Sequence, residues 1–210
     1  MLVQLLANGI ISGCSYALIG FGFALIYFTT KTFHFAHAGV YTLSAYLFFS
    51  FYNLLNFSLL VSILLSILIT AILGVLIDEL IYTPLVKRNS SPSIQMLSSL
   101  GVYIVIVNFI AMFYGNETKV LNPGLQPTYS IGSVILTEIQ IVTFITSLLL
   151  LFAFLIFLKF TRLGLMIRAM RDDPELLMAI GVAPRNIRLF VFAVGSVFAG
   201  VGAILNGLDV

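Results

Sequence analysis

The residues best able to do chemistry are two histidines in an apolar part of the chain. His34 and His37 lie three residues apart in the run Thr-Phe-His-Phe-Ala-His-Ala-Gly, which covers residues 32–39. This spacing places both imidazoles on one face of a helix. Ionisable groups inside a membrane span are costly, and they usually face a bundle interior or an aqueous path. The pair is therefore a candidate for function or for joining helices.

Four roles are open to this pair. A metal or haem site would need more ligands, and the sequence offers no carboxylate, cysteine or third histidine to complete the set, so no metal site is expected. A proton relay and a lining of a transport path both remain open. We favour a structural role, in which the imidazoles hydrogen-bond to neighbouring helices and shape a break in their own helix. The candidate path residues are Asn8, His34, Phe35 and His37.

Other chemistry-bearing residues point away from catalysis. Asp78 and Glu79 lie a short distance before Lys87 and Arg88, and interfacial solvation or a local ion pair accounts for them. The chain has no G-x-x-x-x-G-K-[ST] phosphate loop, no G-x-S-x-G elbow and no H-E-x-x-H helix. The single cysteine, Cys14, excludes an internal disulfide. We therefore expect no enzyme activity and no cofactor in this chain.

The elements that position these residues are membrane helices. The chain is 60% hydrophobic and 9% charged, whereas a soluble domain carries about 25% charged residues. Apolar runs of about 20 residues match the thickness of the hydrocarbon core. The predicted fold class is an all-α polytopic transmembrane helical bundle, one domain over residues 1–210. Its six predicted segments are 5–28, 33–56, 58–80, 94–114, 138–158 and 187–208.

Stripes of small residues in the first and last segments predict close helix packing. In lipid, close backbone approach takes the place of the hydrophobic effect between helices. Spacings of three and four put the small residues of each segment on one face, so we expect both helices to be central and surrounded by others. The predicted packing residues are Gly9, Gly13, Ala17, Gly20, Gly195, Ala199 and Gly202.

The polar insert 159–188 interrupts the membrane segments and contains a predicted short helix at 174–180. Asp173 is a good N-cap, Pro174 suits the first helical position, and Glu175 favours the positive end of the helix dipole. Gly181 can end the helix in the left-handed conformation. A helix of this length is unstable alone. We interpret it as an element at the membrane surface that a partner protein binds.

The basic residues predict the orientation of the loops. The 159–188 insert holds six of them, the 85–92 loop holds two, and the 115–136 loop holds only Lys119. Basic loops stay in the cytoplasm, so the first two are expected inside and the third outside. The position of the N-terminus is left open, because a broken or re-entrant segment 33–56 would reverse it.

The 115–136 loop is expected to hold a short ribbon before the fifth helix. Residues 122–124, Asn-Pro-Gly, signal a turn, and 129–136 look extended. Thr137 with Gln140 three residues on forms a capping-box pattern, which predicts the start of the fifth helix.

Several short motifs follow one another from about residue 5 to the end of the chain. They are Asn8-Gly9-Ile10, Ser12-Gly13, Ser15 to Gly22, Tyr27, Phe35-Ala36-His37, Tyr82-x-Pro84-Leu85, Ser99-Leu100-Gly101, Thr161 to Gly164, Arg168-Ala169, Gly181-Val182 and Phe192-Ala193. Taken together and in order, they resemble the permease subunits of branched-chain amino acid ABC importers. That family has a G-x-x-x-G-x-x-Y-A-L-x-A-x-G run before an N-F-A-H-G signature, and similar residues in its cytoplasmic loop.

The chain departs from the family pattern at three places. His34 replaces the signature asparagine, and Ala38 replaces the glycine after the histidine. The loop run Gly-x-Ala-x-Arg-Ala appears as Gly-Leu-Met-Ile-Arg-Ala over 164–169. Family members also continue further, with another glycine-rich segment and more spans. The sequence does not choose between a fragment, a truncated gene and a remainder supplied by another chain.

The resemblance implies a permease subunit in the plasma (inner) membrane that works with several partners. They are cytoplasmic ABC ATPase subunits holding ATP and Mg²⁺, a sister or identical permease subunit, and a periplasmic or external solute-binding protein, with no nucleic acid. The residues implied in coupling to the ATPase are Arg168, Ala169, Asp173, Pro174, Glu175, Ala179 and Gly181. The alternatives are an ATP-independent carrier or channel, and a truncated membrane scaffold that transports nothing.

Overall fold

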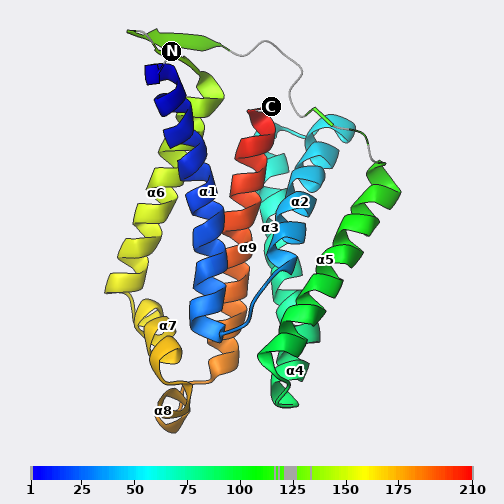
Figure 1. Cartoon of the computed structure of the whole chain (residues 1–210), viewed down its shortest axis with the longest axis vertical. Coiled ribbons are helices and arrows are strands. Elements are labelled where there is room, and N and C mark those ends of the chain that lie inside the picture. Colours follow the sequence, from blue (N-terminus) through cyan, green and yellow to red (C-terminus); the bar gives the residue numbers. More distant parts are fainter. Residues whose placement is uncertain (1, 116, 118, 121–126, 133, 210) are drawn as a thin grey trace.

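The computed structural model describes residues 2–115, 117, 119–120, 127–132 and 134–209, and shows an antiparallel helical bundle (Figure 1). Two π-helical turns, η1 and η2, continue α2 and α3. The helices are α1 (Leu2–Thr30), α2 (Ala36–Phe49), η1 (Ser50–Leu54), α3 (Leu59–Ile77), η2 (Asp78–Tyr82), α4 (Thr83–Lys87), α5 (Pro92–Tyr114), α6 (Glu138–Phe160), α7 (Arg162–Asp172), α8 (Pro174–Ala179) and α9 (Pro184–Leu208).

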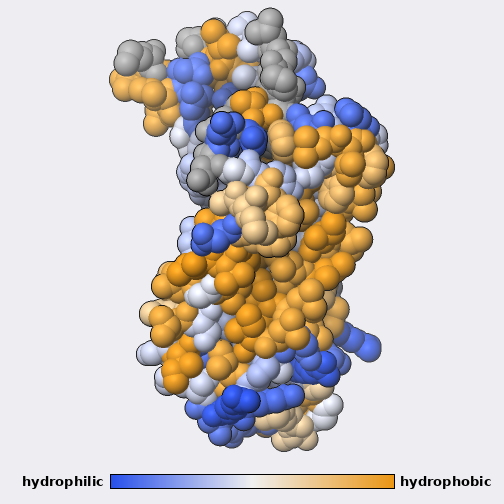
Figure 2. All heavy atoms as spheres, turned by 90° about the vertical axis from the view of Figure 1, so that its right-hand side faces the viewer, coloured by the Kyte–Doolittle hydropathy of each residue, from blue (hydrophilic) through white to orange (hydrophobic). Residues whose placement is uncertain are grey.

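Five helical stretches in the described part of the chain are long and apolar enough to span a membrane. They are Leu2–Thr30, Leu59–Lys87, Pro92–Tyr114, Glu138–Phe160 and Pro184–Leu208. They correspond to five of the six predicted segments. Figure 2 shows a broad hydrophobic belt on the side of the bundle, with hydrophilic residues gathered toward its ends. The molecule is a multi-pass helical membrane protein.

The remaining predicted segment, 33–56, is broken. Residues 31–35 form irregular chain, with Lys31 at a φ of 56°, and α2 begins only at Ala36. The 14 residues of α2 and the 5 of η1 reach about 28 Å at 1.5 Å per residue. Figure 1 shows the irregular chain rising from the lower end of α1 and α2 continuing to the upper end. The segment therefore traverses the bundle, partly as irregular chain.

A two-stranded hairpin lies before α6. Strands β1 (Thr128–Ile131) and β2 (Val134–Thr137) pair antiparallel, which confirms the predicted ribbon. Thr137 and Gln140 form the predicted capping box at the start of α6. The predicted turn at 122–124 lies outside the described residues.

The two ends of the bundle carry different loops. Gln4 in α1 accepts from and donates to the backbone of Ile135 at 2.8 Å, and the Thr137 hydroxyl donates to Asp209 at 3.3 Å. The start of α1, the hairpin and the end of α9 thus share one end of the bundle. The basic loops around α4 and around α7 and α8 lie at the other end (Figure 1), as the charge pattern predicted.

Helix α9 is the central helix, and its glycines permit close contact. It packs on α1, α2 and α3. A Cβ added at Gly195 would lie 2.7 Å from the Cδ1 of Ile26, and one at Gly202 would lie 2.7 Å from the Cγ1 of Ile19. Ala199 is fully buried. The last segment therefore occupies the surrounded position expected from its small residues.

The corresponding prediction for α1 is wrong within this chain. Among the residues that the structure describes, an added Cβ at Gly9, Gly13 or Gly20 would meet no atom within 4 Å, and these glycines are exposed together with Ala17. The reason is that α1 packs on α9 through a different face, where a Cβ on Gly22 would lie 2.7 Å from the carbonyl oxygen of Gly195. The small-residue face of α1 points away from the bundle core.

Candidate functional site

The short helix α8 is built by local signals at both ends. Asp173 is its N-cap, and its Oδ1 accepts from the backbone N–H groups of Glu175 at 3.0 Å and Leu176 at 2.9 Å. Gly181 has a φ of 84°. The N–H of Gly181 donates to the carbonyl of Met178 at 3.0 Å, and that of Val182 to the carbonyl of Leu177 at 3.2 Å. This is a Schellman motif, which favours glycine at the left-handed position.

Helix α8 projects from the bundle and presents apolar side chains outward. Leu176, Met178 and Ile180 are 62%, 54% and 70% exposed. Leu177, at 2%, is the one buried side chain of the helix. Figure 1 shows α8 at the tip of the lower end of the molecule. Large exposed apolar side chains outside the hydrophobic belt are typical of a surface that another protein covers.

The predicted coupling residues divide between two helices. Asp173, Pro174, Glu175, Ala179 and Gly181 all lie exposed on or beside α8. Arg168 and Ala169 instead lie on α7 and are partly buried.

Arg168 faces the bundle rather than the tip of the loop. Its Nη1 donates to the carbonyl of Leu158 at 2.8 Å, which satisfies a free carbonyl at the end of α6. At the far end of α7, Arg171 donates to Asp172 at 2.8 Å, and this hydrogen bond lowers the pKa of the Asp172 carboxyl. Arg168 thus joins α7 to the end of α6, whereas the Arg171–Asp172 pair lies within α7.

Helix α7 was not predicted from the sequence. Thr161 caps it, with Oγ1 accepting from the N–H of Gly164 at 3.0 Å. Its buried residues Gly164, Ile167 and Met170 recur every three residues. This spacing and the threonine before it were readable signals for an amphipathic helix.

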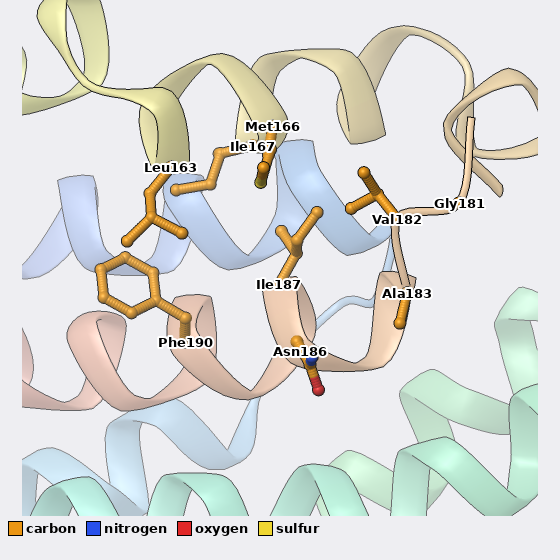
Figure 3. A pocket seen from close by; sticks show the side chains of 9 residues that line it. All are labelled: Leu163, Met166, Ile167, Gly181, Val182, Ala183, Asn186, Ile187 and Phe190. Carbon is orange, nitrogen blue, oxygen red and sulfur yellow. The ribbon is translucent and has the colours of Figure 1, made fainter.

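A cavity of about 360 Å³ separates α7 from the start of α9. Figure 3 shows side chains from α7 facing those from α9, with the connection after α8 closing one end. The loop helix α7 is therefore not closely packed against the start of α9 at this point. Its lining residues are Leu163, Met166, Ile167, Gly181, Val182, Ala183, Asn186, Ile187 and Phe190.

A buried polar network holds the break before α2. The Tyr82 hydroxyl donates to Ser99 Oγ at 2.6 Å and lies 2.8 Å from Nδ1 of His34. Ser99 Oγ also accepts the backbone N–H of Ala36, the first residue of α2, at 3.0 Å. His34, Tyr82 and Ser99 are fully buried. The network satisfies a free N–H at the start of α2 and fixes where the helix begins.

The structure brings only two of the four predicted path residues together. The rings of His34 and His37 lie 5.6 Å apart, and Nε2 of His37 lies 3.3 Å from the carbonyl oxygen of Ile19. Phe35 is 40% exposed. Asn8 accepts a hydrogen bond from Gln4 at 3.2 Å near the hairpin end of α1. It lies 11 residues, or about 16 Å, along α1 from Ile19, which is the residue that His37 contacts.

Both imidazoles contact neighbouring elements, as the structural role requires, and the relay and transport-path roles stay predictions. No group of three or more His, Cys, Asp or Glu side chains that could hold a metal occurs within the described ranges.

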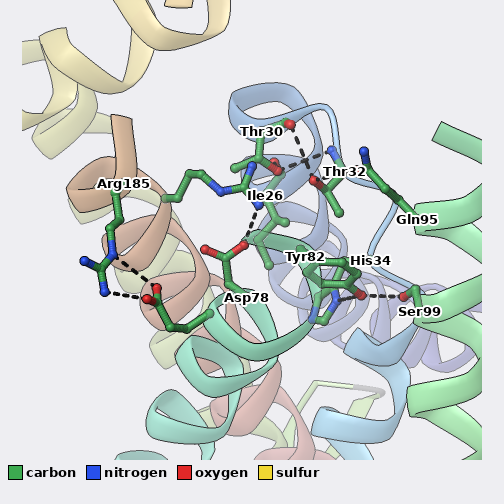
Figure 4. A network of polar contacts seen from close by, with 11 residues as sticks. Ile26, Thr30, Thr32, His34, Asp78, Tyr82, Gln95, Ser99 and Arg185 are labelled. Carbon is green, nitrogen blue, oxygen red and sulfur yellow. Dashed lines mark hydrogen bonds and ion pairs between the residues drawn. The ribbon is translucent and has the colours of Figure 1, made fainter. Parts of the chain in front are cut away.

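The two adjacent carboxylates have different partners from those predicted. Asp78 pairs with Arg188, and Glu79 pairs with Arg185, both on α9 (Figure 4). The expected local pairing with Lys87 and Arg88 is therefore wrong. The two arginines are three positions apart in α9, so they lie on one helix face toward η2. Sequence reasoning missed these pairs because their partners lie 106 and 110 residues away.

Comparison with known proteins identifies the family. The family model described as branched-chain amino acid transport system / permease component matches residues 5–210. The chain belongs to this permease family. No solved structure matches the permease.

Several curated relatives are similar to this permease over nearly its whole length. The high-affinity branched-chain amino acid transport system permease protein BraD of Pseudomonas aeruginosa is 30% identical over 99% of this chain and 71% of its own. The corresponding protein LivH of Salmonella typhimurium is 27% identical over 98% of this chain and 70% of its own. A probable LivH permease of Methanocaldococcus jannaschii is 25% identical over 94% and 64%.

Proposed function

We propose that this permease is the membrane subunit of an importer for branched-chain or related amino acids, driven by ATP hydrolysis in a separate cytoplasmic ATPase. The observation that carries the proposal is α8, a capped helix that exposes three large apolar side chains at the end with the basic loops. Its length is too short for stability alone, so a partner surface around it would both bury the side chains and hold the helix. The names of the relatives support the solute class.

The ATPase subunits supply the chemistry in this proposal. ATP and Mg²⁺ bind to them, and the permease contributes no catalytic residue and no cofactor of its own. Closure of the ATPase pair moves α8, and the cavity between α7 and α9 gives the loop room to shift. The movement then changes the packing of α9 against its neighbours, which opens the bundle alternately to each side.

Two further partners complete the importer. A solute-binding protein docks at the external end, where the hairpin and the start of α1 lie. A second permease subunit, sister or identical, covers the exposed small-residue face of α1 in the membrane. Gly9, Gly13 and Gly20 support this contact, because glycines permit close helix approach and an added Cβ at each would meet no atom of the described residues within 4 Å. The assembly belongs to the plasma (inner) membrane.

Copurification with transport measurement tests the proposal. A tagged permease from its native host should bring down an ATP-binding subunit, and the reconstituted complex should import leucine only with ATP. Serine at the three exposed apolar positions, Leu176, Met178 and Ile180, should remove the ATPase. Serine at three exposed leucines near the other end, Leu54, Leu55 and Leu60, is the matched control.

An intact complex in the α8 variant, with normal ATP-driven uptake, would refute the proposed docking role. Uptake by the permease alone, without any ATPase, would instead favour an ATP-independent carrier.

A further inference from the structure

Two ion pairs join the first turns of α9, here called its base, to the π-helical turn η2. These turns come directly after α7 and α8, which together form the coupling loop. Arg185 and Arg188 follow the end of α8 by less than ten residues and pair with Glu79 and Asp78. The outer pair is open to water, since the Arg185 and Glu79 side chains are 63% and 32% exposed. The inner pair is enclosed, with Arg188 at 10% and Asp78 at 0%. Of the two ion pairs, only the inner one joins α9 to η2 inside the bundle.

The inner pair lies against the network that holds α2. Arg188 lies over the ring of Phe192 at 5.8 Å, and Phe192 contacts the rings of Tyr82 at 5.6 Å and His34 at 5.2 Å. Tyr82 follows Asp78 by four residues on η2. Both partners of the ion pair therefore reach the same aromatic cluster, one through α9 and the other through η2.

The cluster ends at the break in the second segment. Figure 4 shows Asp78 on one side of the network and Tyr82, His34 and Ser99 on the other. The Tyr82 hydroxyl donates a hydrogen bond to Ser99, and Ser99 accepts one from the first backbone N–H of α2. A displacement of η2 thus changes the contact that sets where α2 begins.

The local structure is unusual for a purely stabilising contact. π-Helical turns are rare, and the single turns found inside α-helices are frequent at functional sites. Arg188 Nε and His34 Nε2 have no hydrogen-bond partner among the residues that the structure describes. Buried polar groups are normally satisfied, so these two atoms mark a network that the present contacts leave incomplete.

We propose that the path from Arg188 through Asp78 and Tyr82 to Ser99 and His34 transmits movement of the coupling loop to the irregular start of α2. These are positioning residues: they act on the break before α2 without touching the ATPase. The inference rests on the proposed function, because it assigns the internal route by which α8 acts. Packed interiors move in discrete rearrangements rather than by smooth deformation, so a buried ion pair and a hydroxyl contact can carry such a step.

The test measures the number of solute molecules imported per ATP hydrolysed by the reconstituted complex. The main variant combines Asp78→Leu with Arg188→Met, which removes the pair without leaving an unpaired buried charge. We expect the ATPase to copurify normally and the transport ratio to fall by about tenfold, within the usual range of coupling between sites. The matched control combines Glu79→Gln with Arg185→Gln at the exposed pair, and its ratio should stay at the wild-type value.

Tyr82→Phe is a second test variant, and it leaves the buried aromatic ring in place. It removes only the hydroxyl shared by His34 and Ser99, and the transport ratio should again fall with the ATPase still bound. If the double variant does not accumulate in the membrane, Tyr82→Phe alone tests the proposed internal route. A wild-type ratio in either folded variant would overturn the proposed route.

The outcomes separate the two proposals. If the wild-type complex contains the ATPase and couples normally, and the variants keep the wild-type transport ratio, the internal route is refuted. The proposed function is then unaffected. A wild-type chain that binds no ATPase removes both.

Discussion

Helix α8 and the base of α9 lie only a few residues apart in the chain, but different forces hold them. Local capping groups fix α8, and its surface is largely exposed. The base of α9 is fixed by contacts with η2, whose residues lie more than a hundred positions away. Changes on α8 should therefore alter binding to a partner, whereas changes at the base of α9 should alter the bundle itself.

The largest expected effect is at the buried ion pair. Asp78→Ala leaves the Arg188 guanidinium buried without its counter-charge, and we expect a loss of about 3–5 kcal/mol in unfolding free energy. Glu79→Ala, at the neighbouring exposed pair, should cost no more than about 1 kcal/mol. Thermal unfolding of the detergent-solubilised permease compares the two. Equal losses would contradict the difference in burial.

A close helix contact gives the next effect. A Cβ at Gly74 in α3 would lie 1.9 Å from the hydroxyl oxygen of Ser196 in α9. We expect Gly74→Ala to destabilise the bundle by about 1–3 kcal/mol, because α3 and α9 must move apart. Gly101 in α5 has no atom of the described part of the chain within 4 Å of its Cβ position, so Gly101→Ala should be neutral or stabilising. An unchanged melting temperature for the Gly74 variant would show that the contact is looser than described.

Gly181→Val tests the end of α8. A left-handed conformation costs a branched residue about 1–2 kcal/mol, so the variant should disturb the Schellman motif without unfolding the bundle. We expect ATP-driven uptake to fall while the amount of permease in the membrane stays normal. Normal uptake at normal abundance would count against α8 as the coupling element.

The smallest effect on stability is expected on the outer face of α8. Leu176→Ser removes an exposed side chain, so the unfolding free energy should change by less than about 0.5 kcal/mol. Binding to the ATPase should nevertheless weaken. A clear loss of stability would mean that Leu176 packs within the permease rather than against a partner.

The sequence predicted α8 because the signals for its caps are local. Asp173, Pro174 and Gly181 each act within one helical turn of their own position. Five of the six membrane segments were predictable for a similar reason, since a long apolar run needs no knowledge of its neighbours.

The contacts that hold the bundle could not be predicted from one sequence. The partner of Asp78 depends on how α3 meets α9, and the break before Ala36 depends on Tyr82 and Ser99 in two other helices. The small residues of α1 indicated a packing face, but no local signal says whether that face meets the same chain or another one.

Site-directed cross-linking tests the role of α8 most directly. In a Cys14→Ser background, Met178→Cys on the exposed face of α8 and Tyr129→Cys in the hairpin would each carry a single thiol. A thiol-to-amine cross-linker added to native membranes should join only the Met178→Cys variant to an ATP-binding subunit. No such product from Met178→Cys, or an equal amount from Tyr129→Cys, would contradict the docking of an ATPase on α8.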